Sequence, residues 1–379
     1  MAISKISANM IDGSLTSSLV TGPLPAVDGS ALTGAGAGID TETTSDPTAA
    51  TNPSATGHLW SNKTSGEMFI CTDATAGANI WINVGGGVGD VPGLPFGGIG
   101  GGTAYGYTTG GYTPTIINEI QRFSFTTNGN ATDIANLTTT TYYCAGQSST
   151  SHGYNTGGYN GGYLDRIDKF TFSSIADATD VGNLTVAREG LSGQSSSTHG
   201  YSSGAASPSP TNIIDKFTYS SDGNATDVGD MIATNTNTTG QSSNTHGYIS
   251  GGSNAPANHI QKFSFASDGN ATDTADLTVG VSSPAGQSST THGYSSGGAP
   301  NTDTIGKFSF LSNANATDVG NLTVARHYVS GQSSTTHGYS SGGNGAKNII
   351  DKFSLVSDGN ATDVGDLTSG RHGAGGQQY

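Results

Sequence analysis

One unit of about 46 residues recurs six times between residues 103 and 379, and this period constrains the fold more than any other feature of the sequence. A phenylalanine preceded by a basic residue marks each copy, in steps of 47, 47, 46, 45 and 45 residues: Phe123, Phe170, Phe217, Phe263, Phe308 and Phe353. Two further series keep these steps: Asp133, Asp180, Asp227, Asp273, Asp318, Asp363 and Gln147, Gln194, Gln241, Gln287, Gln332, Gln377. Self-similarity at this period indicates a repeat architecture.

Within each copy, turn signals separate four short segments, which near the C-terminus read GQSS, THGYSSGG, IIDKFSL and ATDVGDLT. The third segment alternates, with Ile350 and Lys352 on one face and Asp351 and Phe353 on the other, as a strand requires. The Asp-Gly in SDGNAT is a strong hairpin signal before the fourth segment. Each copy is therefore predicted to be a four-stranded antiparallel meander, the repeat of a β-propeller blade.

The two ends of the repeat region complement each other. Residues 103–111, TAYGYTTGG, align with the second segment, while the terminal GRHGAGGQQY carries Gln377 at the first-segment position. We therefore expect an all-β, six-bladed propeller over 103–379, closed by the C-terminal strand, because closure removes exposed sheet edges.

The Gly-Gly doublets, the spaced aromatic residues and an Arg before three of the copies resemble the kelch repeat family: Arg188, Arg326 and Arg371. The resemblance covers about three quarters of the chain, from 103 to 379. It implies a kelch-like propeller.

The first hundred residues differ in character from the repeat. Residues 1–34, with LPAVDGSALT, look like the attachment and stalk segments of bacteriophage fibre proteins. Residues 52–87, with LWSNKTSGEMFICTDATAGANIWINVG, resemble a small β module of marine phage structural proteins, in which Trp60, Phe69 and Trp81 would form one core. The predicted organisation is an extended attachment segment (1–51), a β module (52–84), a Gly/Pro linker (85–102) and the propeller (103–379). The resemblance implies a virion protein, a tail or head appendage, that is homotrimeric and binds other virion proteins.

Composition excludes several classes of partner. A formal net charge of -15 with 13 Lys and Arg argues against nucleic acid, which needs a basic surface. No apolar run is long enough to insert into a membrane, and the N-terminal sequence lacks the pattern of a secretory signal, so we expect synthesis in a host cytoplasm. Cys71 and Cys144 fall in different predicted domains and are expected to be free thiols.

The repeated polar residues favour structural roles over chemistry. Five histidines recur at one position, where Tyr105 replaces the sixth: His152, His199, His246, His292 and His337. A metal-binding ring is one interpretation, but a turn histidine bonded to nearby backbone is favoured, since ligands must converge within about 2 Å of one metal. The SDGNATD stretches are likewise interpreted as hairpins rather than calcium loops. The basic residue of each copy is expected to pair with the ATD aspartate on the neighbouring strand. No cofactor and no metal are expected.

No enzyme motif stands out. The chain has four Glu, and most propeller Asp are repeat positions, whereas a catalytic carboxylate pair should break the repeat. We therefore expect a binding protein rather than an enzyme.

Recognition is expected at the end of the blades where the loops vary between copies, namely the loops from strand 2 to 3 and from strand 4 to the next blade. Side chains there suited to sugar stacking or protein contacts are Tyr112, Tyr142, Tyr143, Tyr159, Tyr163, Arg166, His259, His327 and Tyr328. Neutral drift of surface loops is the competing explanation. The predicted function is host-surface adhesion, to a glycan or an outer-membrane protein; the alternatives are docking between virion subunits and, less favoured, glycan depolymerisation.

Overall fold

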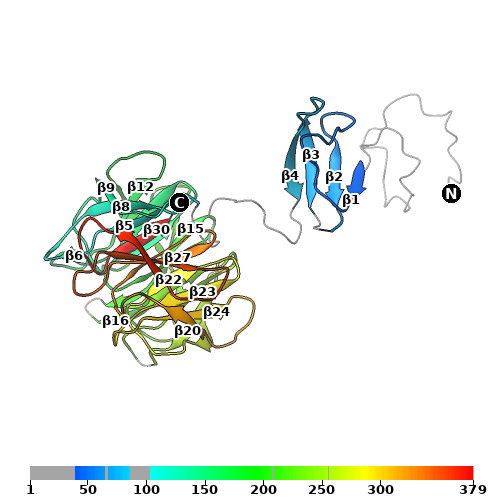
Figure 1. Cartoon of the computed structure of the whole chain (residues 1–379). Coiled ribbons are helices and arrows are strands. Elements are labelled where there is room, and N and C mark those ends of the chain that lie inside the picture. Colours follow the sequence, from blue (N-terminus) through cyan, green and yellow to red (C-terminus); the bar gives the residue numbers. More distant parts are fainter. Residues whose placement is uncertain (1–38, 65–66, 86–102, 207–208, 255, 379) are drawn as a thin grey trace, which may run out of the picture. The chain divides into compact units, whose positions relative to one another are not determined.

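The computed structural model describes residues 39–64, 67–85, 103–206, 209–254 and 256–378, and these residues form strands and no helix (Figure 1). The chain divides into two compact units, 1–93 and 94–379. The predicted attachment segment up to residue 38 and the predicted linker beyond Gly85 lie outside the described residues.

The N-terminal unit contains one mixed four-stranded sheet in the order β1 (Thr41–Thr43), β2 (Leu59–Asn62), β3 (Met68–Asp73) and β4 (Ile80–Gly85). β1 pairs parallel with β2, and the other pairs are antiparallel. The rings of Trp60 and Trp81 lie 5.6 Å apart, and Phe69 sits opposite Trp60 in the register. β1 lies upstream of residue 52, where the sequence places the start of this module.

The C-terminal unit contains six four-stranded antiparallel sheets in its described residues. The first strands are β30 (Gly375–Gln378), β10 (Ala145–Ser148), β14 (Ser192–Ser195), β18 (Thr239–Ser242), β22 (Ala285–Ser288) and β26 (Ser330–Ser333). The second strands are β5 (Tyr105–Thr109), β11 (His152–Thr156), β15 (His199–Ala206), β19 (His246–Ser250), β23 (His292–Ser296) and β27 (His337–Ser341).

The third strands are β8 (Glu119–Ser124), β12 (Arg166–Thr171), β16 (Pro210–Thr218), β20 (His259–Ser264), β24 (Thr304–Ser309) and β28 (Ile349–Ser354). The fourth are β9 (Thr132–Asn136), β13 (Thr179–Asn183), β17 (Thr226–Asp230), β21 (Thr272–Asp276), β25 (Thr317–Asn321) and β29 (Thr362–Asp366). A short hairpin, β6 (Tyr112–Thr113) with β7 (Thr115–Ile116), lies in the first sheet's loop from strand 2 to 3. The four predicted segments of each copy are thus confirmed as four strands in one sheet.

The chain's last strand completes the sheet that begins near residue 105. β30 pairs antiparallel with β5, and Gln377 lies opposite Tyr107. The pairing predicted between the C-terminal segment and the first copy is therefore confirmed.

Each sheet buries side chains on both faces. In β28, Ile350 packs with Tyr339 and Phe123, whereas Phe353 packs with Tyr294 of an adjacent sheet. The alternation predicted for this strand is therefore confirmed. Stacked aromatic pairs such as Phe125 and Tyr339, with ring centroids 4.7 Å apart, hold neighbouring sheets together.

The first strands contact one another through backbone. β10 contacts both β14 and β30, and the remaining first strands contact their neighbours in the same way. A Cβ on Gly286 would lie 2.3 Å from the carbonyl oxygen of Gly240, so only glycine permits this approach. This explains the glycine before every glutamine of the repeat.

The repeated glutamines link each sheet to the next. Gln287, 1% exposed, donates from Nε2 to the carbonyl oxygen of Tyr339 at 2.9 Å. Equivalent bonds join Gln147 to Tyr201, Gln194 to Tyr248, Gln241 to Tyr294, Gln332 to Tyr107 and Gln377 to Tyr154. A buried amide needs such partners, so the glutamine series is a structural requirement.

The SDGNAT hairpins also join adjacent sheets, and here one prediction was wrong. Lys169 pairs with Asp222 in the hairpin of the following sheet at 2.5 Å, rather than with Asp180 on its neighbouring strand. The register places Lys169 opposite Thr179, which leaves Asp180 to pair with Arg166 at 3.0 Å. The sequence-based prediction paired residues of the same copy, whereas the actual partner of Lys169 lies in the adjacent sheet.

Cys71 and Cys144 are both free, as predicted, and the structure buries both of them. Within the described ranges, no helix is long and apolar enough to cross a membrane.

Candidate functional site

The six first strands surround a polar cavity of about 140 Å³. The repeated glycine lines its wall in all six copies, together with the repeated glutamine in four copies and the serine that follows it in five. We call this cavity the axial cavity.

Six equivalent residues form a ring at one end of the axial cavity. Each of them lies two residues before a first strand. They are Tyr143, Gly190, Asn237, Ser283, Tyr328 and Gly373, with φ between 54° and 71°. The N–H of each donates to the carbonyl oxygen of the ring member in an adjacent sheet, at 2.6–3.1 Å, and the sixth bond returns to the first residue. We call this set the mouth ring.

Two tyrosines of the mouth ring adopt an unfavourable backbone conformation. Tyr143 has φ 54° and Tyr328 has φ 57°, a left-handed region that glycine adopts freely. Each such residue costs about 1–3 kcal/mol and is held there by its surroundings, often at a functional site. The repeated backbone bonds hold both residues in this conformation. Because glycine would adopt it without strain, the presence of two tyrosines here indicates a functional role for their rings.

The mouth ring surrounds a second cavity, of about 70 Å³, which shares Cys144 and Thr238 with the lining of the axial cavity. We call it the mouth cavity, and its two sides differ. On one side the rings of Tyr143 and Tyr328 lie 4.9 Å apart, next to Gly373, where a Cβ would lie 2.7 Å from the Tyr143 ring. On the other side Gly190, Asn237 and Ser283 present small or polar groups.

Seven of the nine residues predicted from sequence lie in one aromatic cluster that continues outward from the mouth ring. Ring centroids are separated by 4.3 Å for Tyr142 and Tyr143 and by 4.6 Å for His327 and Tyr328. Tyr112 lies 5.6 Å from Tyr142, which lies 5.9 Å from Tyr159, and Tyr159 lies 5.6 Å from Tyr163. We call these seven residues, together with His372, the aromatic face.

Loop pairing across adjacent sheets holds the aromatic face. Isolated bridges pair Tyr142 with Tyr159, Tyr159 with Tyr163, and Tyr112 with His372. The bridge between Tyr142 and Tyr159 and the bridge between Tyr112 and His372 each join a loop after a fourth strand to a loop between a second and a third strand. The two variable loop sets therefore meet at the same end, as the four-stranded order requires.

The other two predicted residues, Arg166 and His259, lie apart from this cluster. They occupy the same position in different copies, the first residue of a third strand. Arg166 is engaged with Asp180 and lies 3.7 Å from Asp168. The structure therefore gives Arg166 a scaffold contact within its own sheet.

Burial favours the uncharged form of four side chains of the aromatic face, namely Tyr142, Tyr143, His327 and His372. It raises the pKa of Tyr142 and, with a hydrogen bond to Tyr328, raises the pKa of Tyr143 further. Burial also lowers the pKa of His327 and of His372, and the two imidazoles repel each other when protonated. The face therefore offers aromatic surface and neutral hydrogen-bonding groups.

A half-buried glutamate flanks the aromatic face. Burial raises the pKa of Glu189, which precedes Gly190 of the mouth ring and whose charge acts on Tyr142 and Tyr143. Its Oε2 is buried without a hydrogen-bond partner among the described residues. This acceptor was not predicted from sequence.

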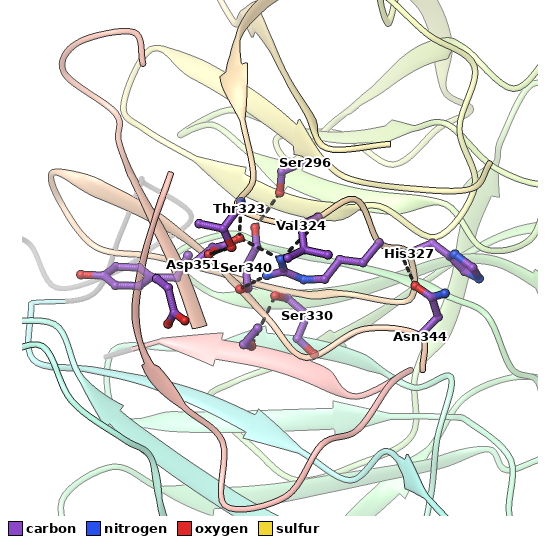
Figure 2. A network of polar contacts seen from close by, with 12 residues as sticks. Ser296, Thr323, Val324, His327, Ser330, Ser340, Asn344 and Asp351 are labelled. Carbon is purple, nitrogen blue, oxygen red and sulfur yellow. Dashed lines mark hydrogen bonds and ion pairs between the residues drawn. The ribbon is translucent and has the colours of Figure 1, made fainter. Parts of the chain in front are cut away.

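A buried ion pair anchors the loop that carries His327 and Tyr328. Arg326, fully buried, contacts Asp351 at 2.8 Å and donates to the carbonyl oxygen of Ser340 at 2.9 Å (Figure 2). The next residue, His327, donates its N–H to Asn344 Oδ1 at 3.0 Å. Arg188 with Asp215 repeats the arrangement, whereas Arg371 pairs with the partly exposed Glu119, which lies two residues before the position equivalent to Asp351. The three arginines of the kelch-like pattern thus position loops at the variable end.

The recurrent histidines lie in turns at the opposite end of the sheets. His292 bonds through Nδ1 to Thr291 Oγ1 at 2.8 Å, and its N–H donates to Ser289 Oγ at 3.0 Å. The ring partner is a neighbouring side chain rather than the expected backbone. The described parts of the chain contain no group of three or more His, Cys, Asp or Glu arranged to hold a metal.

Sequence reasoning missed His372 of the aromatic face and two residues that line the mouth cavity, Thr238 and Ser283. The rings of His372 and Tyr328 lie 5.8 Å apart. Thr238 and Ser283 line the mouth cavity, and their types are too common to attract notice. The mouth ring could have been found from sequence because its members share one repeat position. Three of them, Gly190, Asn237 and Gly373, are residue types that tolerate a left-handed backbone.

Comparison with known proteins identifies no family model that matches the chain and no significantly similar curated protein. The site is therefore interpreted from its own geometry.

Proposed function

We propose that residues 103–379 form a closed six-bladed β-propeller and that its variable-loop end binds a ligand on a cell surface without catalysis. The ring of backbone bonds through Tyr143, Gly190, Asn237, Ser283, Tyr328 and Gly373 returns to its start, which supports closure. A second ring of bonds, at the opposite end of the first strands, also supports closure. In it Ser148 N donates to Ser195 Oγ and Gln378 N donates to Ser148 Oγ, both at 3.1 Å.

One observation carries the binding proposal: Tyr143 and Tyr328 are held in a strained conformation at the mouth of a cavity. Evolution of a purely structural ring would favour glycine there, as at Gly190 and Gly373. Tyrosines that are exposed in part and fixed in position are typical of binding sites, because little side-chain entropy is lost on contact.

In this proposal the protein is a virion appendage, whose N-terminal segment attaches to the particle and whose propeller contacts a host glycan or outer-membrane protein. The resemblance of residues 1–34 to phage fibre segments, and of residues 52–87 to a β module of marine phage structural proteins, supports it. Three copies per fibre would raise the strength of attachment by avidity.

The test is adhesion of the labelled full-length protein to intact cells of a panel of marine bacterial and cyanobacterial strains. We expect saturable binding to at least one strain, and no reducing ends released from its polysaccharide. Absence of adhesion to every strain, with the propeller face buried against other subunits in a particle map, would favour the structural alternative.

A further inference from the structure

We propose that the mouth cavity is a carbohydrate subsite that holds one sugar ring between Tyr143 and Tyr328 on one side and the hydroxyls of Thr238 and Ser283 on the other. This inference rests on the proposed cell-surface binding and commits it to a glycan rather than a protein.

The first argument is the division of the cavity into an aromatic and a polar side. A pyranose ring has apolar C–H faces and a rim of hydroxyl groups, so it needs aromatic surface and hydrogen-bonding groups together. Tyr143 and Tyr328 supply the aromatic surface, and Gly373 between them leaves the room that the Tyr143 ring occupies.

The second argument is a pair of buried hydroxyls without partners. Thr238 is 6% exposed and Ser283 is 8% exposed, and neither Thr238 Oγ1 nor Ser283 Oγ has a hydrogen-bond partner among the described residues. Both residues line the mouth cavity. Buried polar atoms are normally satisfied, so an unsatisfied pair on residues that line a cavity points to a ligand that supplies the missing partners.

The third argument is charge. On the aromatic side, burial raises the pKa of Tyr143 and so favours its neutral phenol. No Asp, Glu, Lys, Arg or His is among the described residues that line the mouth cavity, and a neutral sugar needs uncharged donors and acceptors. A hydroxyl can donate to or accept from a sugar hydroxyl, which suits Thr238 and Ser283 to this role.

The binding experiment uses the full-length protein and two probes: protein-free polysaccharide extracted from a strain to which it adheres, and a set of methyl glycosides of common bacterial hexoses. Saturation-transfer NMR detects contact with each glycoside, and competition with the polysaccharide locates both at one site. We expect binding of the polysaccharide and of at least one glycoside.

Four variants separate binding from folding. Tyr143→Gly and Tyr328→Gly remove the rings and relieve the left-handed strain, so we expect an unchanged or higher Tm and at least tenfold weaker binding. Thr238→Val and Ser283→Ala remove the unpartnered hydroxyls, with the same expected pattern and a three- to tenfold loss.

Two matched controls lie away from the mouth cavity. Ala346→Gly relieves the same backbone strain, at φ 53°, and Ser295→Ala removes another buried hydroxyl without a partner in the described residues. Both should leave sugar binding unchanged.

The failures of the two proposals are distinguishable. Adhesion to cells that persists after all surface polysaccharide is removed, or equal polysaccharide binding by the four variants and the wild type, would overturn the carbohydrate subsite and leave adhesion standing. Loss of adhesion to every strain would instead remove the proposed function.

Discussion

In the sheets of the C-terminal unit, both ends repeat their backbone geometry from copy to copy, but only one end also repeats its side chains. At the end that carries SSTTHG and SDGNAT, the same side chains make the same bonds in copy after copy, as His246 with Thr245 and His292 with Thr291 do at 2.8 Å. At the other end the mouth ring repeats six backbone bonds while its side chains range from none in Gly190 to a phenol ring in Tyr328. The ring at the variable end therefore depends on backbone bonds, which leaves its side chains free to vary between copies.

The largest effect on stability is expected at the buried ion pairs, which lie at the variable end but stabilise the fold there. They therefore test the division between the two ends. Asp351→Ala leaves Arg326 buried without its carboxylate partner, and the expected loss in free energy of unfolding is about 3–5 kcal/mol. Denaturant unfolding of the full-length protein measures it.

The chain supplies a control for this variant. Val281 and Gly306 occupy the positions of Arg326 and Asp351 in the preceding copy. The double variant Arg326→Val with Asp351→Gly should recover most of the loss. A double variant as unstable as Asp351→Ala would show that the charge itself is required.

The next largest effect is expected where backbones touch around the axial cavity. In Gly286→Ala the new Cβ would lie 2.3 Å from the Gly240 carbonyl oxygen, and overpacking of this kind costs about 1–3 kcal/mol or more. Gly359 lies in a hairpin, where a Cβ would meet nothing within 4 Å, so Gly359→Ala should change stability little. Equal losses in thermal unfolding would contradict the close approach of first strands.

A smaller effect distinguishes pairing between sheets from pairing within a sheet. Lys169 and Asp222 are partly exposed, and such pairs contribute about 0.2–1 kcal/mol. A double-mutant cycle with Lys169→Met and Asp222→Asn should give a coupling energy in this range that falls with added salt. A matching cycle with Asp180→Asn should give none, and coupling there would restore the pairing first expected from sequence.

The smallest effect is the pH dependence of the turn histidines. Burial, and then the nearby Lys307, lower the pKa of His292 below its ordinary 6.5, with Asp358 opposing. The unfolded chain therefore binds protons more readily, and stability present above pH 6.5 falls as the pH drops through the lowered pKa. His292→Tyr, which installs the residue found at Tyr105, should reduce the decrease in Tm between about pH 7.5 and about pH 5. An unchanged pH profile would contradict the burial of this imidazole.

The period and turn chemistry of the sequence were enough to predict four strands per copy and the return of the C-terminal strand beside β5. They were not enough to predict contacts between copies. Gln287 bonds a strand in the next sheet and Lys169 bonds a hairpin in the next sheet, and both partners depend on how sheets stack.

The candidate site was predicted in outline only. Loop variation drew attention to Tyr143 and Tyr328, but their left-handed backbone and the asymmetry of the cavity depend on three-dimensional placement. Thr238 and Ser283 became notable only because their hydroxyls are buried without partners in the described residues. Arg166 has the residue type expected of a binding site but is held by Asp180.

The most direct test of the division between the two ends is hydrogen–deuterium exchange of the full-length protein with and without the polysaccharide of a bound strain. We predict slower exchange on binding in peptides that contain Tyr142–Tyr143, His327–Tyr328 and His372–Gly373, with no change in those containing the SSTTHG turns. Protection confined to the SSTTHG turns would contradict the account and move recognition to the end assigned here to scaffold.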